Sequence, residues 1–306
     1  MNLRHLQYIV AIADEQNISK AAERLFISRP ALNHYLIKLE AELGAPLFKR
    51  VKKKLIPTYT GAVYVESARR MLEIKKQAYK LIADTSVEAD GVIGLGVTRE
   101  IGVGLLKDVF PAFTKKYPNY RLDLLEGNAR ELEVALENGR IDLAVMGCRS
   151  APPALEHISF MRCELVAVLP PGHPLGIRAA AKGGPRPTLD LRLLKDDKFI
   201  LICRDTNIRE VCDRHFARAG VLPRIVMECS LSTLAYSMVK QKLGASILME
   251  LQVNEEDGVH CFSLKPKESW SQGVTYRKGA TFTKVEEYFI QLARDYFAKN
   301  TPLHME

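Results

Sequence analysis

Residues 18–50 read ISKAAERLFISRPALNHYLIKLEAELGAPLFKR and predict two helices joined by a tight turn. In the first helix, Ala21 and Leu25 lie on one apolar face, and Ser19 is placed to cap the start. Residues 26–28 then turn the chain, and the second helix begins directly after them. The polar and apolar positions of both helices follow the 3.6-residue period of an amphipathic helix.

The second of these helices combines an apolar stripe with a polar face. Its leucines recur at positions 32, 36, 39 and 43, and Gly44 follows as a natural stop. Ser28 is placed to cap its start, and Pro30 falls in the first turn, where a missing N–H costs nothing. Two such helices joined by a short turn form the layout of a DNA-binding helix-turn-helix. The predicted DNA contacts are Ser28, Arg29, Pro30, Asn33, His34 and Lys38.

Basic residues follow directly. Residues 49–58 alternate and are rich in Lys and Arg, as expected of a β-wing that touches the phosphate backbone. The first sixty residues hold ten Lys or Arg against five Asp or Glu, which is more than half of the chain's net charge of +8. A basic run is usually a solvated loop, but beside a helix-turn-helix it supplies affinity with little sequence information. The predicted wing contacts are Arg50, Lys52, Lys53 and Lys54.

Residues 60–86 predict one long amphipathic helix. Apolar side chains such as Val63, Met71 and Ile82 form a stripe that exceeds what a lone surface helix needs. We therefore expect this linker helix to pair with its copy in a second molecule. The alternative is that the stripe packs only on its own domain.

From residue 90 onward, apolar strands alternate with helices. Strands are predicted over residues 92–98, 121–126, 141–146, 165–169, 199–203, 225–228 and 245–249. Helices are predicted over residues 103–116, 129–138, 208–219, 233–242 and 284–299. This alternation predicts a parallel sheet covered on both faces. A Pro- and Gly-rich stretch at 170–187 divides the region into two α/β lobes, and the terminal helix is expected to return to the first lobe.

These residues resemble the LysR-type transcriptional regulators. The resemblance rests on residues 21–25, 28–32 and 39–50, on Thr58 and Gly61, and on residues 141–144 and 172–175. It implies an α+β multi-domain protein with a winged helix-turn-helix over 1–60, a linker (dimerisation) helix over 61–89, and an effector domain over 90–306. That domain is expected to have two α/β lobes, as in periplasmic binding proteins, with lobe I at about 90–162 and 267–306 and lobe II at about 163–266. The implied function is sequence-specific regulation of transcription, controlled by a small metabolite.

Two positions depart from the family pattern. Family members often carry Gln where this chain has Arg29, and Ser or Thr where it has Asn33. Arg favours guanine and Asn favours adenine when side chains contact major-groove base edges. We therefore expect a shifted operator preference.

The effector is expected between the lobes, where loops leave the carboxyl ends of strands. Several of these loops run into helix starts, whose N–H groups bind anions. In the family, hydroxyl residues matching Thr98 contact the effector. The predicted effector-binding residues are Thr98, Arg99, Asn128, Gly147, Arg149, Cys203, Arg204, Thr206, Ser230 and Ser232. The arginines favour a small anion, a carboxylate or an aromatic acid, although each hydroxyl could equally be a helix cap and each Arg a surface ion pair.

Other chemistries are weakly represented. The six cysteines include no CxxC pair, so we expect neither a zinc site nor a disulfide framework. Cys203 and Cys212 could form a peroxide-sensing pair, as in one branch of the family, but their flanking residues do not match that branch. The glycines at 91, 94 and 96 are spaced GxxGxG, which is not a dinucleotide fingerprint. We predict no catalytic residue, no metal and no cofactor.

Two other protein classes fit parts of the pattern. A solute-binding protein would need a signal peptide, which the N-terminus does not suggest, and would not need the DNA-binding segment. An α/β enzyme with an added regulatory domain would show catalytic residues that the spacing does not reveal. No apolar run is long enough to cross a bilayer, so the expected location is the cytoplasm. The expected partners are double-stranded DNA, a small-molecule effector, further copies in a homodimer or homotetramer, and, as a candidate, RNA polymerase.

Overall fold

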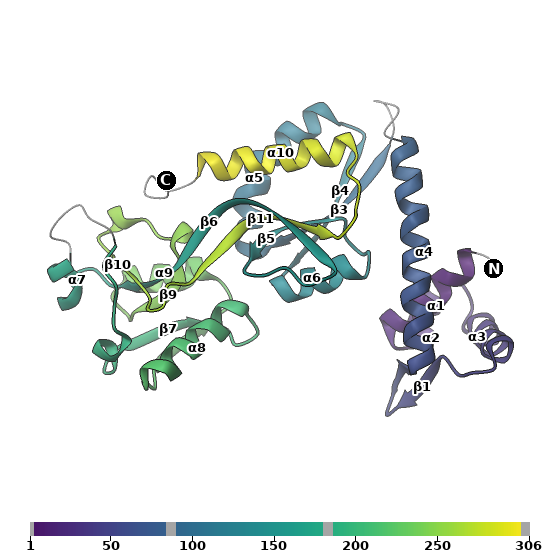
Figure 1. The fold of residues 1–306 in the computed structure, drawn as a ribbon, viewed down its shortest axis with the longest axis horizontal. Helices are drawn as coiled ribbons and strands as arrows, with labels where there is room; N and C mark the ends of the chain where they lie inside the picture. The colour runs from purple at the N-terminus through teal and green to yellow at the C-terminus, as the bar shows by residue number, and fades with distance from the viewer. Residues whose placement is uncertain (1–2, 84–89, 180–185, 301–306) are drawn as a thin grey trace. The chain divides into compact units, whose positions relative to one another are not determined.

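The structure is a computed structural model that describes residues 3–83, 90–179 and 186–300 (Figure 1). The chain forms two compact units, Met1–Ser86 and Val87–Glu306. Each unit has its own apolar core and is described by itself. No helix among the described residues is long and apolar enough to cross a membrane.

The N-terminal unit begins with three helices around one core. These are α1 (Leu3–Glu15), α2 (Ile18–Arg24) and α3 (Arg29–Leu43). Ile12 and Leu32 are fully buried between them. The prediction that Ser19 caps α2 is wrong. The cap is Asn17, whose side-chain oxygen accepts a hydrogen bond from the backbone N–H of Ser19 at 2.9 Å.

Helix α3 ends and the wing begins in one hydrogen-bonded corner. The helix ends at Gly44, where a φ of +66° favours glycine. The carboxylate of Glu40 then accepts from the N–H of Leu47 at 2.6 Å and from that of Phe48 at 3.1 Å. These bonds hold the start of an antiparallel hairpin against the helical core. Its strands are β1 (Phe48–Val51) and β2 (Lys54–Pro57).

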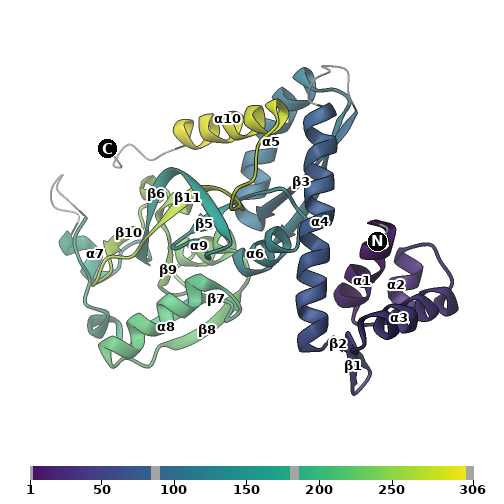
Figure 2. The same ribbon diagram turned by 45° about the vertical axis from the view of Figure 1, so that its right-hand side comes forward.

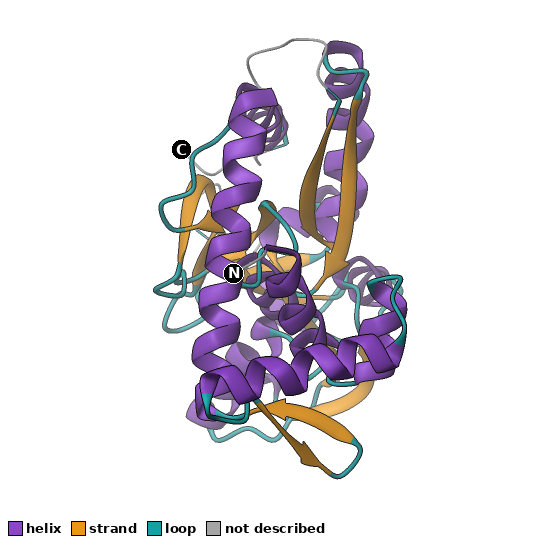
Figure 3. Ribbon diagram, turned by 90° about the vertical axis from the view of Figure 1, so that its right-hand side faces the viewer, coloured by secondary structure: helices purple, strands orange, loops and turns teal. Residues whose placement is uncertain are grey.

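Helix α4 (Tyr59–Ala83), the long helix in Figure 3, starts against this corner. It has both buried and exposed apolar side chains. Only glycine fits at Gly61, because a Cβ there would lie 1.7 Å from the carbonyl oxygen of Leu47. Val65 and Ala68 are buried in the core of the unit. The exposed apolar side chains of α4 include Val63, Met71, Ile74 and Tyr79. Of the predicted stripe, Ala68 is therefore part of the core, whereas Val63, Met71, Tyr79 and Ile82 are exposed.

The larger of the two sheets described in the C-terminal unit is curved and mixed (Figure 1). Its strands are β3 (Gly91–Thr98), β4 (Tyr120–Gly127), β5 (Leu143–Cys148), β6 (Leu155–Leu169), β9 (Ser246–Met249), β10 (His260–Ser263) and β11 (Ser269–Arg277). They are hydrogen-bonded in the order β10-β6-β11-β5-β3-β4, and β9 also pairs with β6. Strand β3 is parallel to β4 and β5, but β11 is antiparallel to β5 and β6. The prediction of parallel strands is confirmed for β3–β5 and for the separate two-stranded sheet of residues 198–202 and 224–229. It is wrong for the rest of the large sheet, because the chain returns through β11, a strand that the sequence did not reveal.

Strand β6 joins two lobes. Its residues 155–164 pair with β11 in lobe I, and its residues 165–169 pair with β9 and β10 in lobe II. The helices of lobe I are α5 (Arg99–Lys116), α6 (Ala129–Glu137) and α10 (Lys284–Lys299). Lobe II adds α7 (Pro174–Ala179), β7 (Lys198–Ile202), α8 (Asn207–Ala219), β8 (Arg224–Cys229), α9 (Ser232–Lys240) and 3-10 turns at Leu191–Leu194, Glu250–Gln252 and Glu255–Asp257 (Figure 2). One apolar cluster extends from Phe113 in lobe I to Phe199 in lobe II, so the lobes share a core.

Phe26 has an unfavourable backbone conformation in the turn between α2 and α3. Its φ is +54°, and its side chain is 96% exposed. The left-handed region costs most residues about 1–2 kcal/mol, whereas Asn tolerates it better. We expect Phe26→Asn to raise the free energy of unfolding by about 0.5–1 kcal/mol in urea denaturation, because little packing is lost. Phe26→Leu is the control and should change little, while a less stable Phe26→Asn would contradict this account.

Candidate functional site

One face of α3 is polar and exposed. The Oγ of Ser28 accepts a hydrogen bond from the N–H of Ala31 at 3.3 Å and so caps the helix. The predicted contact residues of this helix are all exposed: Ser28, Arg29, Pro30, Asn33, His34 and Lys38. Of the predicted leucine stripe, positions 32, 36 and 39 are buried, whereas Leu43 is exposed. Sequence reasoning missed Ile37, which is 58% exposed one turn after Asn33, and an apolar side chain there suits a thymine methyl group.

The wing presents the basic run to solvent. Arg50, Lys52, Lys53 and Lys54 are all exposed. Strands β1 and β2 pair from Phe48 opposite Pro57 to Val51 opposite Lys54, so the turn holds two of these lysines. An exposed polar helix face and a basic hairpin are the parts that a winged helix-turn-helix uses, the helix for base edges and the wing for phosphates. DNA contact by the individual residues stays a prediction.

A cavity of about 140 Å³ lies between the two lobes of the C-terminal unit. An engineered apolar cavity of about 150 Å³ admits benzene, so this space suits a ligand the size of one ring. The ends of β3, β4, β5 and β7 and the starts of α5, α6, α8 and α9 contribute to its wall, together with parts of the segments 249–252 and 270–272. Strand ends and helix starts from both lobes therefore meet at one place.

Seven of the ten predicted effector residues line this cavity: Thr98, Arg99, Asn128, Gly147, Thr206, Ser230 and Ser232. They come from both lobes and are far apart in the sequence. The fold thus brings them together, and their contact with an effector stays a prediction.

Three predicted effector residues lie outside the cavity wall. Arg204 is 76% exposed and lies 3.8 Å from Glu228 on β8. The N–H of Cys203 donates to the carbonyl of Cys229 at 2.9 Å, which ties Cys203 to the neighbouring strand. Arg149 is exposed after the end of β5. The rule that ligands bind where loops leave the carboxyl ends of strands places a loop near the cavity. It does not decide where each side chain of that loop points.

The helix starts at the cavity differ in whether a side chain caps them. Asn128 caps α6 by accepting from the N–H of Glu131 at 2.9 Å, and Thr206 caps α8 by accepting from the N–H of Arg209 at 3.2 Å. Thr98 stands at the same position before α5, but its side chain makes no capping bond. The first N–H groups of a helix have no intrahelical partner and form its positive end. The start of α5 therefore keeps its capacity to bind an anion.

Glu100 bridges the two lobes across the cavity. It lies in the first turn of α5, and its carboxylate accepts hydrogen bonds from the backbone N–H of Ser232 at the start of α9 and from Nε2 of Gln252. The charged residues of the wall are Arg99, Arg130, Glu100 and Asp205. Two positive and two negative side chains make the wall neutral in sum, in contrast to the basic wall that the predicted arginines implied.

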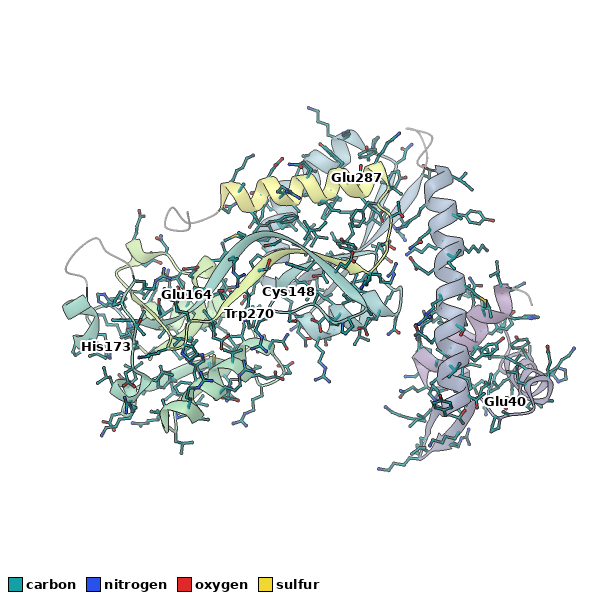
Figure 4. The ribbon with its side chains drawn as sticks, viewed as in Figure 1. Glu40, Cys148, Glu164, His173, Trp270 and Glu287 are labelled. Carbon is teal, nitrogen blue, oxygen red and sulfur yellow. The ribbon has the colours of Figure 1, made fainter. Side chains whose placement is uncertain are left out.

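Sequence reasoning missed part of the cavity wall. The missed residues include Glu100, Arg130, Asp205, Met249, Leu251, Gln252, Trp270 and Gln272. Met249 is the last residue of β9, and Leu251 and Gln252 lie just after it, so the rule that ligands bind at the carboxyl ends of strands could have found all three. Trp270 and Gln272 lie on β11, where Ser, Gln and Gly interrupt the strand-forming Trp, Val, Thr and Tyr residues. Trp270 is the single tryptophan of the chain and lies in the middle of the unit (Figure 4).

The suggested peroxide-sensing cysteine pair gains no support from the structure. Cys212 is buried in α8, and this burial raises the pKa of its thiol to about 12. A thiol with so high a pKa is a poor nucleophile near neutral pH. Cys203 is bonded through its backbone N–H to the carbonyl of Cys229 on the neighbouring strand.

Family models match both units. The model for the bacterial regulatory helix-turn-helix protein of the lysR family matches residues 3–62, and the model for the LysR substrate binding domain matches residues 87–298. The chain therefore belongs to the LysR family, whose members are DNA-binding transcriptional regulators and not enzymes.

Other proteins are similar to this chain over almost its full length. The HTH-type transcriptional regulator BsdA of Bacillus subtilis (strain 168) is 30% identical over 302 residues, which span 95% of this chain and 100% of BsdA. A full-length OxyR variant from Pseudomonas aeruginosa shares the fold with a TM-score of 0.67 at 23% identity, over 97% of this chain and 94% of that one. Full-length CbnR complexed with its target DNA gives a TM-score of 0.52 at 22% identity, over 97% of this chain and 100% of that one.

The residues predicted to read bases and those predicted to bind phosphates should respond differently to substitution. Arg29→Ala and Asn33→Ala should each reduce the discrimination between operator and random duplex by about 1–3 kcal/mol, because each would remove a contact to a base edge. Lys53→Ala should weaken both duplexes alike and flatten the salt dependence. Fluorescence anisotropy over a range of salt concentrations measures both effects. Equal losses on operator and random DNA in Arg29→Ala would show that Arg29 does not read bases.

Proposed function

We propose that this regulator responds to a small carboxylate, aliphatic or aromatic, bound in the cavity between its lobes. The observation that carries the proposal is the uncapped start of α5, where Thr98 and the first turn of the helix lie on the cavity wall beside Arg99 and Arg130. A carboxylate at this point would accept hydrogen bonds from the hydroxyl and the helix N–H groups. A neutral apolar ligand would leave these donors unpaired, at about 1–3 kcal/mol each.

Effector binding is proposed to act on DNA binding through the relation between the lobes. Residues from both lobes line the cavity, so a ligand contacts both at once. The ligand can shift the protein between two arrangements only by the difference in its affinity for them. The shared core and strand β6 favour small, cooperative shifts of the lobes over independent movement.

We propose that the change in the arrangement of the lobes affects DNA binding through the oligomeric assembly. Exposed apolar residues on α4, among them Val63, Ile74 and Tyr79, support pairing of this helix with its copy. A second contact between C-terminal units would then give a homotetramer that holds several winged helices at a set spacing. As a DNA-binding regulator, the protein is proposed to act in the cytoplasm, with RNA polymerase as a further partner.

The hydroxyl of Thr98 provides the sharpest test of the carboxylate site. Thr98→Val keeps the shape and removes the hydroxyl, so it should weaken carboxylate binding about ten-fold. Ligand-free operator binding and stability should stay near wild type, because Thr98 caps no helix N–H. Titration calorimetry of the full chain with a carboxylate found by thermal-shift screening measures the affinity.

Thr206→Val is the matched control for this substitution. It removes a hydroxyl that does cap a helix, so it should lower the stability by about 1 kcal/mol. Unchanged carboxylate affinity in Thr98→Val would place the site elsewhere.

Assembly depends on the exposed stripe of α4 in this account. Ile74 is 67% exposed, and Ile74→Glu would bury a charge wherever two copies of α4 pair. Such an unpaired charge costs several kcal/mol, so sedimentation velocity should show smaller species than for wild type. Ile74→Leu keeps the apolar surface and should assemble normally. An unchanged assembly in Ile74→Glu would show that α4 does not pair with its copy through this stripe.

A further inference from the structure

Two residues that line the cavity carry buried polar atoms without a hydrogen-bond partner among the described residues. Trp270 and Gln272 both line it and are only 7% and 4% exposed. Neither the indole N–H of Trp270 nor Oε1 of Gln272 has a hydrogen-bond partner among the described residues. Buried polar atoms are almost always paired in folded proteins, since an unpaired one costs about 1–3 kcal/mol. Two side chains of the cavity wall therefore have unused hydrogen-bonding capacity.

Gln252 adds a hydrogen-bond acceptor, because its neighbour Glu100 fixes the orientation of its side-chain amide. Its Nε2 donates to the carboxylate of Glu100. An ionised carboxylate only accepts hydrogen bonds, so the amide of Gln252 cannot be turned the other way round. Its Oε1, which is buried and has no partner within the described part of the chain, must therefore be an acceptor. The wall thus offers unpaired acceptors as well as donors.

Glu100 gives the acceptor side a negative charge. Its oxygens are held by the N–H of Ser232 and by Gln252, both in lobe II. A carboxylate has about four lone-pair sites, so this anchored group can accept further hydrogen bonds. Asp205 adds a second negative charge to the same wall.

We propose that the effector is a zwitterion, a carboxylate that also carries an ammonium group, such as a free amino acid. This inference rests on the proposed function, because it keeps the carboxylate at Thr98 and the start of α5. The ammonium group donates to Glu100 and to Oε1 of Gln252. A plain carboxylate would leave these acceptors unpaired, and a neutral polyol would leave the charged groups of both signs without a counter-charge.

Matched ligand series test the proposal on the full-length protein. Each proteinogenic amino acid is titrated, and every one that binds is compared with its α-hydroxy and α-deaminated analogues, for example leucine with 2-hydroxy-4-methylpentanoate and 4-methylpentanoate. The readout is the fluorescence of Trp270, the single tryptophan of the chain, with thermal shift as a second measurement. At least one amino acid should bind about ten-fold or more tightly than its deaminated analogue, as expected for a charge-assisted hydrogen bond.

Glu100→Gln separates the ammonium site from the carboxylate site. It keeps an acceptor oxygen for the N–H of Ser232 but removes the negative charge, so the amino acid should lose most of its advantage while the deaminated analogue binds as before. Glu210→Gln is the control, because Glu210 is an exposed first-turn residue of α8 that does not line the cavity. Should Glu100→Gln fail to fold, Gln252→Met removes the fixed acceptor and should reduce the same advantage.

The possible results distinguish a failure of the zwitterion proposal from a failure of the proposed function. If the deaminated acids bind as tightly as the amino acids, or if only other carboxylates bind, the zwitterion is excluded and the carboxylate site stands. If no carboxylate of either kind changes the fluorescence or the thermal midpoint, the proposed function itself is excluded. Tighter binding of both ligand classes by Glu100→Gln would show that Glu100 competes with the ligand, which overturns its assigned role.

Discussion

Strand β6 belongs to both lobes of the C-terminal unit, and the position of the cavity depends on it. At its crossing point, the N–H of Glu164 donates to the Glu250 carboxylate at 2.7 Å, and Nη1 of Arg186 lies 2.5 Å from the same carboxylate. Glu250 directly follows β9, so these contacts also position the segment that contributes Gln252 to the wall. Removing one member of a buried charged cluster leaves its partners uncompensated, so the crossing resists change.

Local capping then decides what the cavity can bind. Asn128 and Thr206 use their side chains on their own helices, whereas Thr98 does not. The start of α9 is occupied by Glu100 from the other lobe. In the proposal, the free donors lie at the start of α5, and the acceptors are Glu100 in the first turn of the same helix and Gln252 in lobe II. Groups that suit a negative charge and groups that suit a positive charge are therefore proposed to lie on one wall.

Sequence patterns predicted correctly those elements whose apolar periodicity and capping residues all lie within one short stretch of the chain. Helix α10 has the predicted limits, Lys284–Lys299, because its apolar stripe and its capping Thr283 are local. Only residues 165–169 of β6 were predicted. Its first half carries His157, whose ring nitrogens bond Thr275 and Ser271 at 2.9 Å, and both lie on β11, more than a hundred residues away. Arg149 and Arg204 were expected to line the cavity, but Arg130 lines it instead. Tertiary packing decides the direction of each side chain, and a local sequence pattern does not contain that information.

Occupancy of this cavity and binding of DNA are proposed to be coupled. This coupling can be measured through Trp270 by titrating a bound carboxylate with and without saturating operator duplex. Linkage requires that DNA change the affinity for the carboxylate by the same factor by which the carboxylate changes the affinity for DNA. The account predicts equal factors in the two directions, in the range of about 5 to 150. A carboxylate affinity that is the same with and without operator DNA would contradict it.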